Sequence, residues 1–547
     1  MSIYKYLFSI SKKNVLYALI AGLISGASST GVIAVINHTI NNQQSTGYHI
    51  VLAFIALCLT MLLSSLVSGY LLIKLAQGSI INLRINLSKR ILSTPLRKVE
   101  QNGSHRLLAS LTDDVMAIAN AITVSPMLII NLFIVLGCLI YMGWLSISVL
   151  FIGLTFMTIA FFSYQMLMKI ANKYLASARE EHDSLFRHFK SLTSGTKELK
   201  MSKQRRIDFF DKQLTPTIRG VYKDTVKGMT IYTAAGNWGQ MLFLFFIALV
   251  IFFIPQLNLV STEILTGYTL SILYMITPLV TILNVFPNFG RANVALRKIE
   301  KLELATEDEE LMSNREQLPS SFNEIRLIDL THTYYREEED HNFTLGPINL
   351  TFKENELIFL VGGNGSGKTT LAKLITGLYE PEGGRIEVNG QPITDKHIDH
   401  YRQLFSTVFS DFYLFEQFIG ISEDKVKEEA EEYLRLLQLN HKVKVEEDRL
   451  STTDLSGGQR KRLALLVSYL EDRPFYVFDE WAADQDPLFK DFFYTKLLPA
   501  LKGKGKTVLV ISHDDKYFNV ADRIIKIDYG QVIKDEPIEA LSQQAAE

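Results

Sequence analysis

Six long apolar segments fall in the first 290 residues of this 547-residue chain, and they constrain its fold more than any other feature. Each segment is close to the ~20 residues that a helix needs to cross a bilayer, and none carries a charge in its central part. Six such runs within one water-soluble domain would be exceptional. The segments lie at about residues 15–37, 50–73, 126–144, 146–170, 229–254 and 264–288. We therefore expect six membrane-spanning helices.

Lys and Arg are distributed asymmetrically between the loops that join these segments. The loops without Lys or Arg are 38–49, the turn near Gly143–Trp144, and 255–263. The basic stretches are the N-terminus with Lys5, Lys12 and Lys13, and the segments 74–125 and 171–227, which carry seven and thirteen such residues. Because positive loops stay on the cytoplasmic side, we expect a multi-pass protein with both termini in the cytoplasm.

The two long basic segments are too long to be simple turns. Both show apolar residues at three- and four-residue spacing with few helix breakers, so we expect helices that continue well into the cytoplasm. Such extensions typically end in a contact with a cytoplasmic domain.

The pattern changes in the C-terminal half of the chain. We interpret 1–311 as a transmembrane domain of six helices and the polar segment 312–322, which contains Pro319, as a linker. From 323 to 547, short apolar strands alternate with helices, which predicts an α/β domain with a largely parallel sheet. The formal net charge of −2 argues against a nucleic-acid partner held by bulk charge.

A glycine-rich motif after the apolar run Leu357–Val361 is the strongest local signal of function. It satisfies G-x-x-x-x-G-K-[ST] between a strand and a helix, the context in which this loop binds phosphates. Its amides would surround phosphate oxygens, Lys368 would reach the β- and γ-phosphates, and the Thr369 hydroxyl would bind Mg²⁺. The expected nucleotide-binding residues are Gly362, Gly363, Asn364, Gly365, Ser366, Gly367, Lys368, Thr369 and Thr370.

Two further apolar strands end in residues suited to phosphate chemistry. Phe475–Phe478 leads to Asp479, a candidate Mg²⁺ ligand, and Glu480, a candidate base for the attacking water. Val508–Ile511 leads to Ser512 and His513, and a histidine there can contact the γ-phosphate.

The sequence Leu455-Ser-Gly-Gly-Gln459 lies between the phosphate loop and the Asp-Glu pair, and it opens a helix whose N-terminus can face an anion. The order of these motifs behind six spans resembles an ABC exporter half-transporter over nearly the whole chain. That resemblance implies an ATP-driven transporter in the cytoplasmic (inner) membrane, in contact with lipid, in which two copies pair head to tail. The nucleotide would then lie between the phosphate loop of one copy and Ser456, Gly457, Gly458 and Gln459 of the other. A homodimer is the simpler interpretation, and a heterodimer stays open.

The resemblance also implies roles for individual residues. Tyr334 is expected to stack on adenine, with Tyr335 as the close alternative, and Asp486 is expected to cross the dimer seam. Ser410 occupies the place of the usual glutamine that joins the nucleotide to the membrane helices, and it is a candidate Mg²⁺ ligand. Because serine lacks the reach of a glutamine side chain, either Asp411 substitutes for it or the Mg²⁺ and the attacking water are coupled differently.

Asn364, Ser410-Asp411 and the runs Glu480–Pro487 and Ser512–Phe518 together resemble the exporters of cyclic peptides, microcins and pyoverdine-type siderophore precursors. The peptide-like substrate is expected to meet uncharged amides in the spans, and we single out Asn237 and Gln240 as lining residues, with interhelical hydrogen bonding as the alternative. Two rival functions stay open at this point. One is a multidrug or lipid exporter on the same scaffold, and the other is an ATP-gated sensor or channel that does not transport.

Overall fold

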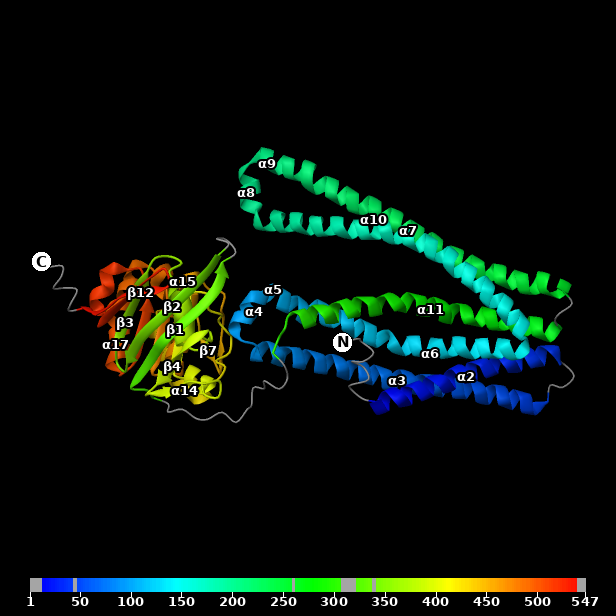
Figure 1. The fold of residues 1–547 in the computed structure, drawn as a ribbon, viewed down its shortest axis with the longest axis horizontal. Coiled ribbons are helices and arrows are strands. Elements are labelled where there is room, and N and C mark those ends of the chain that lie inside the picture. Colours follow the sequence, from blue (N-terminus) through cyan, green and yellow to red (C-terminus); the bar gives the residue numbers. More distant parts are fainter. Residues whose placement is uncertain (1–11, 43–46, 258–260, 306–320, 337–340, 539–547) are drawn as a thin grey trace. The chain divides into compact units, whose positions relative to one another are not determined.

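The computed structural model describes residues 12–42, 47–257, 261–305, 321–336 and 341–538 (Figure 1). The chain forms two compact units, and each is described here by itself. The first comprises the residues up to Ser88 together with His105–Glu303, and the second comprises Lys89–Ser104 together with Leu304 onward. Most of the expected linker, 312–322, lies outside the described residues.

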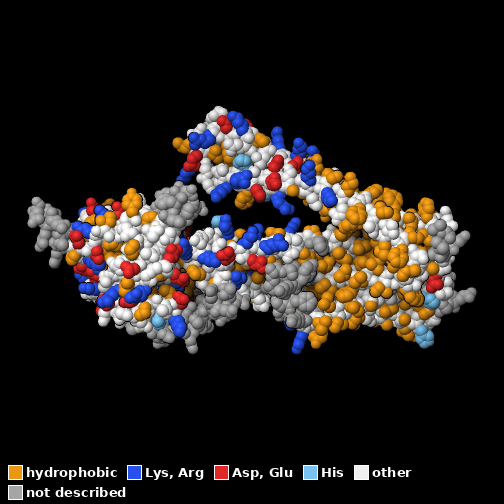
Figure 2. All heavy atoms as spheres, in the orientation of Figure 1, with side chains coloured by type: hydrophobic (Ala, Val, Ile, Leu, Met, Phe, Trp, Pro, Cys, Tyr) orange, Lys and Arg blue, Asp and Glu red, His pale blue; other side chains and the backbone are white. Residues whose placement is uncertain are grey.

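Within its described residues, the first unit contains six helices that are long and apolar enough to cross a membrane, as the sequence predicts. They are built on α2 (Lys12–Asn41), α3 (Tyr48–Ser93), α6 (Val115–Leu145), α7 (Ile147–Ser194), α10 (Thr215–Ala248) and α11 (Thr262–Lys301). Hydrophobic side chains gather over one stretch of these helices, and Lys and Arg gather over their extensions (Figure 2). This separation matches a helix bundle that is part membrane-embedded and part solvated.

The predicted cytoplasmic extensions are helical in the structure. α3 runs on to Ser93 and is followed by α4 (Leu96–Asn102), α5 (Ser104–Ala109) and the π-helical turn η2 (Ser110–Asp114). α7 runs on to Ser194 and is followed by α8 (Thr196–Met201), α9 (Lys203–Asp208) and the π-helical turn η3 (Phe209–Leu214). At the far end of α10 lie η4 (Leu249–Phe253) and η5 (Ile254–Leu257).

Small residues allow the helices of the first unit to approach closely. α7 packs along α10, while α6 packs along both α2 and α11. A Cβ atom on Gly137 of α6 would lie 2.3 Å from the Thr30 hydroxyl of α2, so only glycine fits there. The buried amide of Asn37 donates to the Tyr141 hydroxyl at 3.0 Å and accepts from Thr266 at 2.6 Å, which ties α2 to α6 and α11.

The second unit is built on two sheets, as expected for an α/β domain. The larger sheet has the order β12-β11-β3-β10-β9-β6, and all its pairs except β11–β12 are parallel. Its strands are β3 (Leu357–Gly362), β6 (Phe405–Val408), β9 (Phe475–Asp479), β10 (Thr507–Ile511), β11 (Arg523–Asp528) and β12 (Gln531–Pro537). The antiparallel sheet contains β2 (His341–Lys353), β1 (Glu324–Arg336), β4 (Gly383–Val388) and β5 (Gln391–Pro392), and a hairpin joins β7 (Val445–Glu446) to β8 (Arg449–Leu450).

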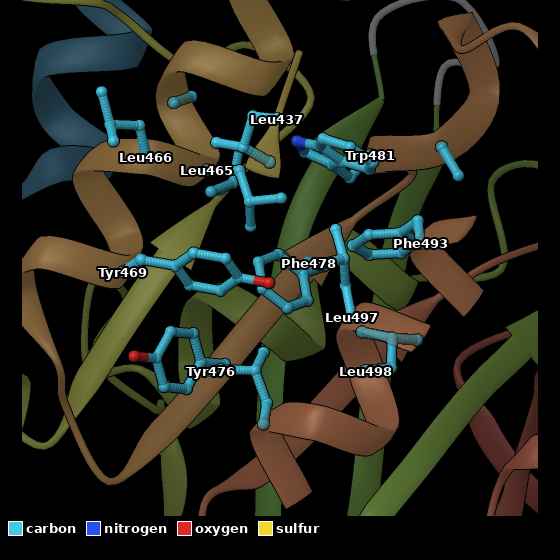
Figure 3. Close-up of a cluster of buried hydrophobic side chains, with 14 of the residues drawn as sticks. Leu437, Leu465, Leu466, Tyr469, Tyr476, Phe478, Trp481, Phe493, Leu497 and Leu498 are labelled. Atoms are coloured by element: carbon cyan, nitrogen blue, oxygen red, sulfur yellow. The ribbon is translucent and has the colours of Figure 1, made fainter. Parts of the chain in front are cut away.

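Two hydrophobic cores hold this unit together. One lies around α12 (Lys368–Ile375) and includes residues of both sheets. The other gathers residues of α14 (Glu423–Leu436), α15 (Gly457–Glu471), η7 (Phe493–Leu497) and α17 (Leu498–Gly503) against β9 and β10. In this core Phe478, Trp481 and Phe493 lie together (Figure 3). The remaining short helices are α13 (Ile398–Arg402), η6 (Trp481–Asp484), α16 (Pro487–Phe492) and η8 (Asp515–Val520).

Candidate nucleotide-binding and transport sites

Four neighbouring parallel strands bring the sequence-predicted phosphate residues to one edge of the larger sheet. β3, β10, β9 and β6 are adjacent in that order. Lys368 follows β3, His513 follows β10, and Ser410 follows β6. Asp479 ends β9, and Glu480 comes directly after it. The carboxyl ends of parallel strands are the usual ligand site of such sheets, so the fold converts four separate motifs into one site.

The phosphate loop adopts a conformation that requires its glycines. Gly365 and Gly367 have φ values of 75° and 103°, and a Cβ atom on Gly367 would lie 2.8 Å from the Leu345 side chain. Gly363, Asn364 and Gly365 form the exposed crest, and Thr370 is half-buried behind Lys368 and Thr369.

The Lys368 side chain lies beneath the phosphate loop. Its ammonium donates to the carbonyl oxygens of Gly362 at 3.0 Å and Gly363 at 2.9 Å. Burial lowers the pKa of Lys368, while the carboxylates of Glu480 and Asp479 oppose that shift. A buried ammonium that donates to backbone carbonyl oxygens gains from a phosphate anion, which suits the loop to a nucleotide.

Asp479 has the surroundings of a cation ligand. Its Oδ2 atom accepts from the Thr369 hydroxyl at 3.0 Å and from the Ser410 hydroxyl at 3.5 Å, whereas Oδ1 is buried with no hydrogen-bond partner among the described residues. Burial raises the pKa of Asp479, and the Thr369 hydrogen bond opposes that shift. A buried carboxylate oxygen without a partner, beside two hydroxyls, fits Mg²⁺, which prefers oxygen ligands and keeps several waters.

Glu480 and His513 approach each other from adjacent strands. His513 Nε2 and Glu480 Oε1 are 3.2 Å apart, and both side chains are partly exposed. A carboxylate with access to solvent beside an imidazole is suited to general-base catalysis on a water molecule. Glu480 itself has left-handed backbone angles, φ 47° and ψ 33°.

The Leu-Ser-Gly-Gly-Gln motif forms the N-terminus of α15. The Gln459 side chain accepts from the backbone N–H of Ser456 at 3.3 Å, closing a capping box. A Cβ atom on Gly458 would lie 2.8 Å from the carbonyl oxygen of Asp484, so glycine allows α15 to approach the segment after Glu480. Gly457 starts the helix and has open space around its Cα within the chain.

Asp486 is held in place by contacts of its own. Its carboxylate accepts from the N–H of Phe489 at 3.0 Å, capping α16, and pairs with the Arg462 guanidinium. These contacts, the Phe489 N–H first, lower the pKa of Asp486. Tyr334 and Tyr335 lie near the end of β1, and their side chains lie outside the described part of the chain.

Sequence reasoning missed Lys461, and it noted Trp481 only as an altered residue after Glu480 and not for its contacts. The Lys461 ammonium donates to the carbonyl oxygen of Glu480 at 3.1 Å, and the Trp481 indole N–H donates to the carbonyl oxygen of Lys461 at 2.8 Å. Nothing in the spacing of the motifs announces these bonds. The tryptophan directly after the Asp-Glu pair is the one sequence feature that draws attention to this junction.

A cavity of about 510 Å³ lies in the first unit between α7, α10 and α11. It brings together Asn237 and Gln240, both singled out from the sequence, and adds Asn284. Its other lining residues are mainly aromatic and aliphatic, and no Lys, Arg, Asp or Glu lines it among the described residues. The nearby Trp238 indole donates instead to the Ser163 hydroxyl at 2.8 Å.

The segment Lys89–Ser104 makes polar contacts within the second unit. The Glu100 carboxylate pairs with Lys373 at 2.7 Å and accepts from the Tyr379 hydroxyl. Arg97 pairs with Glu382 at 2.7 Å. These contacts show that the helical extension after α3 meets the α/β domain, as the sequence predicts for such an extension.

Comparisons with known proteins agree with this geometry. A family model described as "ABC transporter transmembrane region" matches residues 14–279, and one described as "ABC transporter" matches residues 345–483. The ATP-binding protein SyrD of Pseudomonas syringae pv. syringae is 35% identical over 98% of this chain and 96% of its own length. The ATP-dependent lipid A-core flippase of Vibrio cholerae serotype O1 is 24% identical over 96% of this chain and 92% of its own.

A solved structure of a bacterial Atm1-family ABC exporter with ATP bound shares the fold, with a TM-score of 0.73 and 15% identity over 98% of this chain and 97% of that one. Together with the full-length relative, these matches cover both units. The chain therefore belongs to the ABC transporters, as an exporter half-transporter in which a six-helix transmembrane region is fused to a domain that hydrolyses ATP to drive transport.

Proposed function

We propose that this chain exports a peptide or peptide-like molecule across the cytoplasmic membrane as a homodimer. The cavity between α7, α10 and α11 is the observation that carries this proposal. Its lining combines three side-chain amides with aromatic rings and contains no charged group among the described residues. Amides pair with the N–H and C=O groups of a peptide backbone, and aromatic rings pack on its side chains.

Tyr164 and Asn237 lie at one end of the cavity, and the stacked rings of Phe156 and Phe246 lie at the other. Tyr164 lies eight positions beyond Phe156 along α7, about 12 Å at 1.5 Å per residue, and Asn237 precedes Phe246 along α10. Because α7 and α10 run in opposite directions, Tyr164 and Asn237 share one end. The distribution of Lys and Arg makes that the cytoplasmic end. A substrate with a peptide-like head and an apolar part would fit with its head toward the cytoplasm.

A second candidate function is the export of a lipid or a lipophilic drug. The mainly apolar lining of the cavity favours it, and several relatives carry the name lipid A-core flippase. The two candidate substrates differ in whether they need hydrogen bonds from the side chains of Asn237 and Gln240. A lipid tail gains nothing from these amides, whereas a peptide backbone loses hydrogen bonds when they are removed.

For the nucleotide site we propose defined roles. Lys368 and the loop amides bind the phosphates, and Thr369, Asp479 and Ser410 hold Mg²⁺, which neutralises phosphate charge when bound. Glu480 takes a proton from the attacking water, and His513 orients that carboxylate. Tyr334 stacks on adenine.

The dimer itself is part of the proposal. One chain contains both the phosphate-binding motifs and the Leu-Ser-Gly-Gly-Gln motif, so two copies give two equivalent sites. In each site, Ser456–Gln459 and Asp486 of one copy complete the nucleotide site of the other copy. We further propose that both termini lie in the cytoplasm, and that closing of the ATPase domains opens the transport cavity outward.

The proposal is tested by measuring ATP hydrolysis of the purified chain in lipid nanodiscs while cyclic peptides, linear peptides, siderophore precursors, lipids and drugs are titrated. We expect selective stimulation by a peptide class. Glu480→Gln serves as the blank, because it removes the proposed base and keeps the fold. Hydrolysis no greater than this blank would overturn the ATP-driven function altogether.

The cavity variants separate the two substrate classes. We expect Asn237→Ala and Gln240→Ala to reduce stimulation by the peptide and to leave basal hydrolysis unchanged. Asn131→Ala is the matched control, because this amide lies on α6, donates to its own helix at Met127 and does not line the cavity. Stimulation by lipids or drugs alone, unaffected by either cavity variant, would establish the second candidate.

A further inference from the structure

The backbone of Glu480 is held in an unusual conformation by contacts on both sides. Its φ of 47° lies in the left-handed region, which a glutamate rarely adopts. Its N–H donates to the Ile511 carbonyl of β10 at 3.1 Å. Its own carbonyl oxygen accepts from the Lys461 ammonium at 3.1 Å and from the Ala483 N–H at 3.3 Å. The direction of the Glu480 side chain therefore depends on the groups that donate hydrogen bonds to this carbonyl oxygen.

Lys461 is an unusual residue for its place. Its side chain is 9% exposed on a helix whose buried positions are otherwise mostly apolar, and a lysine is rarely buried without a partner. It pairs with the Asp484 carboxylate at 2.7 Å while it donates to Glu480. One ammonium thus joins α15 to both ends of the Glu480–Asp484 turn.

Trp481, directly after Glu480, makes a second connection between the Glu480–Asp484 turn and α15. The Trp481 indole N–H donates to the carbonyl oxygen of Lys461 at 2.8 Å. The ring is buried and stacks on Phe493, with centroids 4.3 Å apart (Figure 3). Because this ring is packed in the core and bonded to α15, it couples the turn to the helix beside Lys461.

We propose that Lys461 is a positioning residue that ties the Leu-Ser-Gly-Gly-Gln helix to the glutamate that activates water. This inference rests on the proposed roles of Glu480 and of the dimer. In that dimer, α15 contacts the nucleotide bound by the other chain, whereas Glu480 serves the nucleotide bound by its own chain. Lys461 therefore transmits a displacement of α15, caused by the nucleotide at one site, to Glu480, which is the base of the second site.

Removal of this lysine leaves its partners satisfied. Asp484 is 64% exposed and can be solvated, and the Glu480 carbonyl keeps its bond from the Ala483 N–H. Lys461→Met keeps most of the side-chain length and apolar stem. We therefore expect a folded variant that has lost the ammonium alone, with its nucleotide-binding loop intact.

The chain offers a matched control at the other end of the same helix. Lys506 donates to the carbonyl oxygen of Asp472 at 3.2 Å and pairs with its carboxylate at 2.8 Å, and Asp472 also has a left-handed φ of 51°. Like Lys461, this lysine contacts one backbone carbonyl and one carboxylate, although both belong to Asp472, and 17% of its side chain is exposed. It lies away from the phosphate loop, so Lys506→Met tests the structural part of the effect alone.

The experiment measures ATP hydrolysis of the full chain in nanodiscs against ATP concentration. We expect Lys461→Met to lower kcat at least ~10-fold, to leave the KM for ATP within about twofold, and to bring the Hill coefficient toward one. Lys461→Arg, which keeps the charge and donors, should restore kcat and the Hill coefficient. Lys506→Met should change neither. If Lys461→Met gives no folded dimer, Lys461→Gln replaces it with the same expectation.

The outcomes separate this inference from the proposed function. Wild-type hydrolysis above the Glu480→Gln blank, together with unchanged kcat and Hill coefficient in Lys461→Met, would overturn the inference and leave the transporter function standing. An equal loss in Lys461→Met and Lys506→Met would also overturn it, because the effect would then be loss of a helix anchor. Wild-type hydrolysis no greater than the blank would instead remove the proposed function on which the inference rests.

Discussion

The imidazole of His513 lies beside the carboxylate of Glu480, with Nε2 and Oε1 3.2 Å apart. The two residues come from the ends of the neighbouring parallel strands β10 and β9, and their side chains are 47% and 40% exposed. An exposed carboxylate oriented by an imidazole can meet both a water molecule and a phosphate at the sheet edge. With the roles proposed above for Glu480 and His513, the attacking water would be activated at this pair.

Replacing Glu480 by Gln should abolish turnover and leave binding intact. The amide keeps the size of the side chain and cannot accept a proton, so we expect hydrolysis to fall by about 10²- to 10⁴-fold. Retention of a radiolabelled nucleotide by the variant, measured by rapid filtration, should be at least as strong as in the wild type. An active Glu480→Gln protein would refute the assignment of the base.

Asp479→Asn should weaken the dependence on Mg²⁺ in a defined way. The amide cannot supply the negative charge that the buried Oδ1 atom would direct at a cation bound in the proposed site. We therefore expect the Mg²⁺ concentration for half-maximal hydrolysis to rise at least ~10-fold, in the range seen when metal-site residues are changed. Asp472→Asn is the control, because it removes a carboxylate at the far end of α15. An equal Mg²⁺ dependence in Asp479→Asn and the wild type would show that the cation is held elsewhere.

Gly458→Ala should misplace the segment that follows Glu480. The new methyl group would lie 2.8 Å from the carbonyl oxygen of Asp484, a backbone atom that can yield only by moving the turn. We expect kcat for ATP to fall by roughly 10- to 100-fold, as shifts of about 1 Å in catalytic groups do. Gly503→Ala, where a Cβ meets nothing within 4 Å, should retain normal turnover. Normal turnover in Gly458→Ala would mean that the turn tolerates displacement.

The six spans and the phosphate site could be predicted from the sequence because a short continuous stretch of residues identifies each span and each phosphate motif. An apolar run longer than a bilayer is thick needs no tertiary context, and Lys368, Asp479, Glu480 and His513 each follow a recognisable buried strand. The parallel order of those strands then brings them together. Ser410 entered through family resemblance, and the structure places its hydroxyl 3.5 Å from Asp479.

The rest depends on packing between distant segments, which local patterns do not encode. Lys461 looks like an ordinary basic residue of a helix, and only the fold shows its ammonium on the Glu480 carbonyl. The convergence of Asn237 and Asn284 on one cavity requires α10 and α11 to be placed relative to each other. The grouping of Lys89–Ser104 with the second unit follows from side-chain contacts such as Glu100–Lys373.

Glu100→Ala should separate hydrolysis from transport. This carboxylate binds both Lys373 and Tyr379, so its removal loosens the cytoplasmic extension from the ATPase core and leaves the phosphate loop unchanged. We expect basal hydrolysis within about twofold of the wild type and substrate stimulation reduced at least ~5-fold, the lower range of coupling energies between sites. Glu354→Ala, an exposed glutamate between β2 and β3, is the control. Full stimulation in Glu100→Ala would show that coupling runs through other contacts.

His332 should make the same contact region sensitive to acid. The ring is buried against Tyr379, with ring centroids 5.2 Å apart, and neither nitrogen has a hydrogen-bond partner among the described residues. Burial first, and then the nearby Arg97 guanidinium, lower the pKa of His332, while Glu382 opposes the shift. The folded protein therefore disfavours the imidazolium form that the unfolded chain adopts freely below pH ~6.5.

The sign of the effect follows from proton binding. Below pH ~6.5 the unfolded chain binds a proton that the folded protein does not, so stability falls as pH falls, by at most about 1.4 kcal/mol per pH unit for this one group. We expect the melting temperature to drop between pH 7.5 and 5.5 more in the wild type than in His332→Phe, which keeps the stacking on Tyr379 and cannot titrate. His441→Phe, an exposed histidine, should retain the wild-type drop. An equal drop in His332→Phe and the wild type would place the acid-sensitive group elsewhere in the chain.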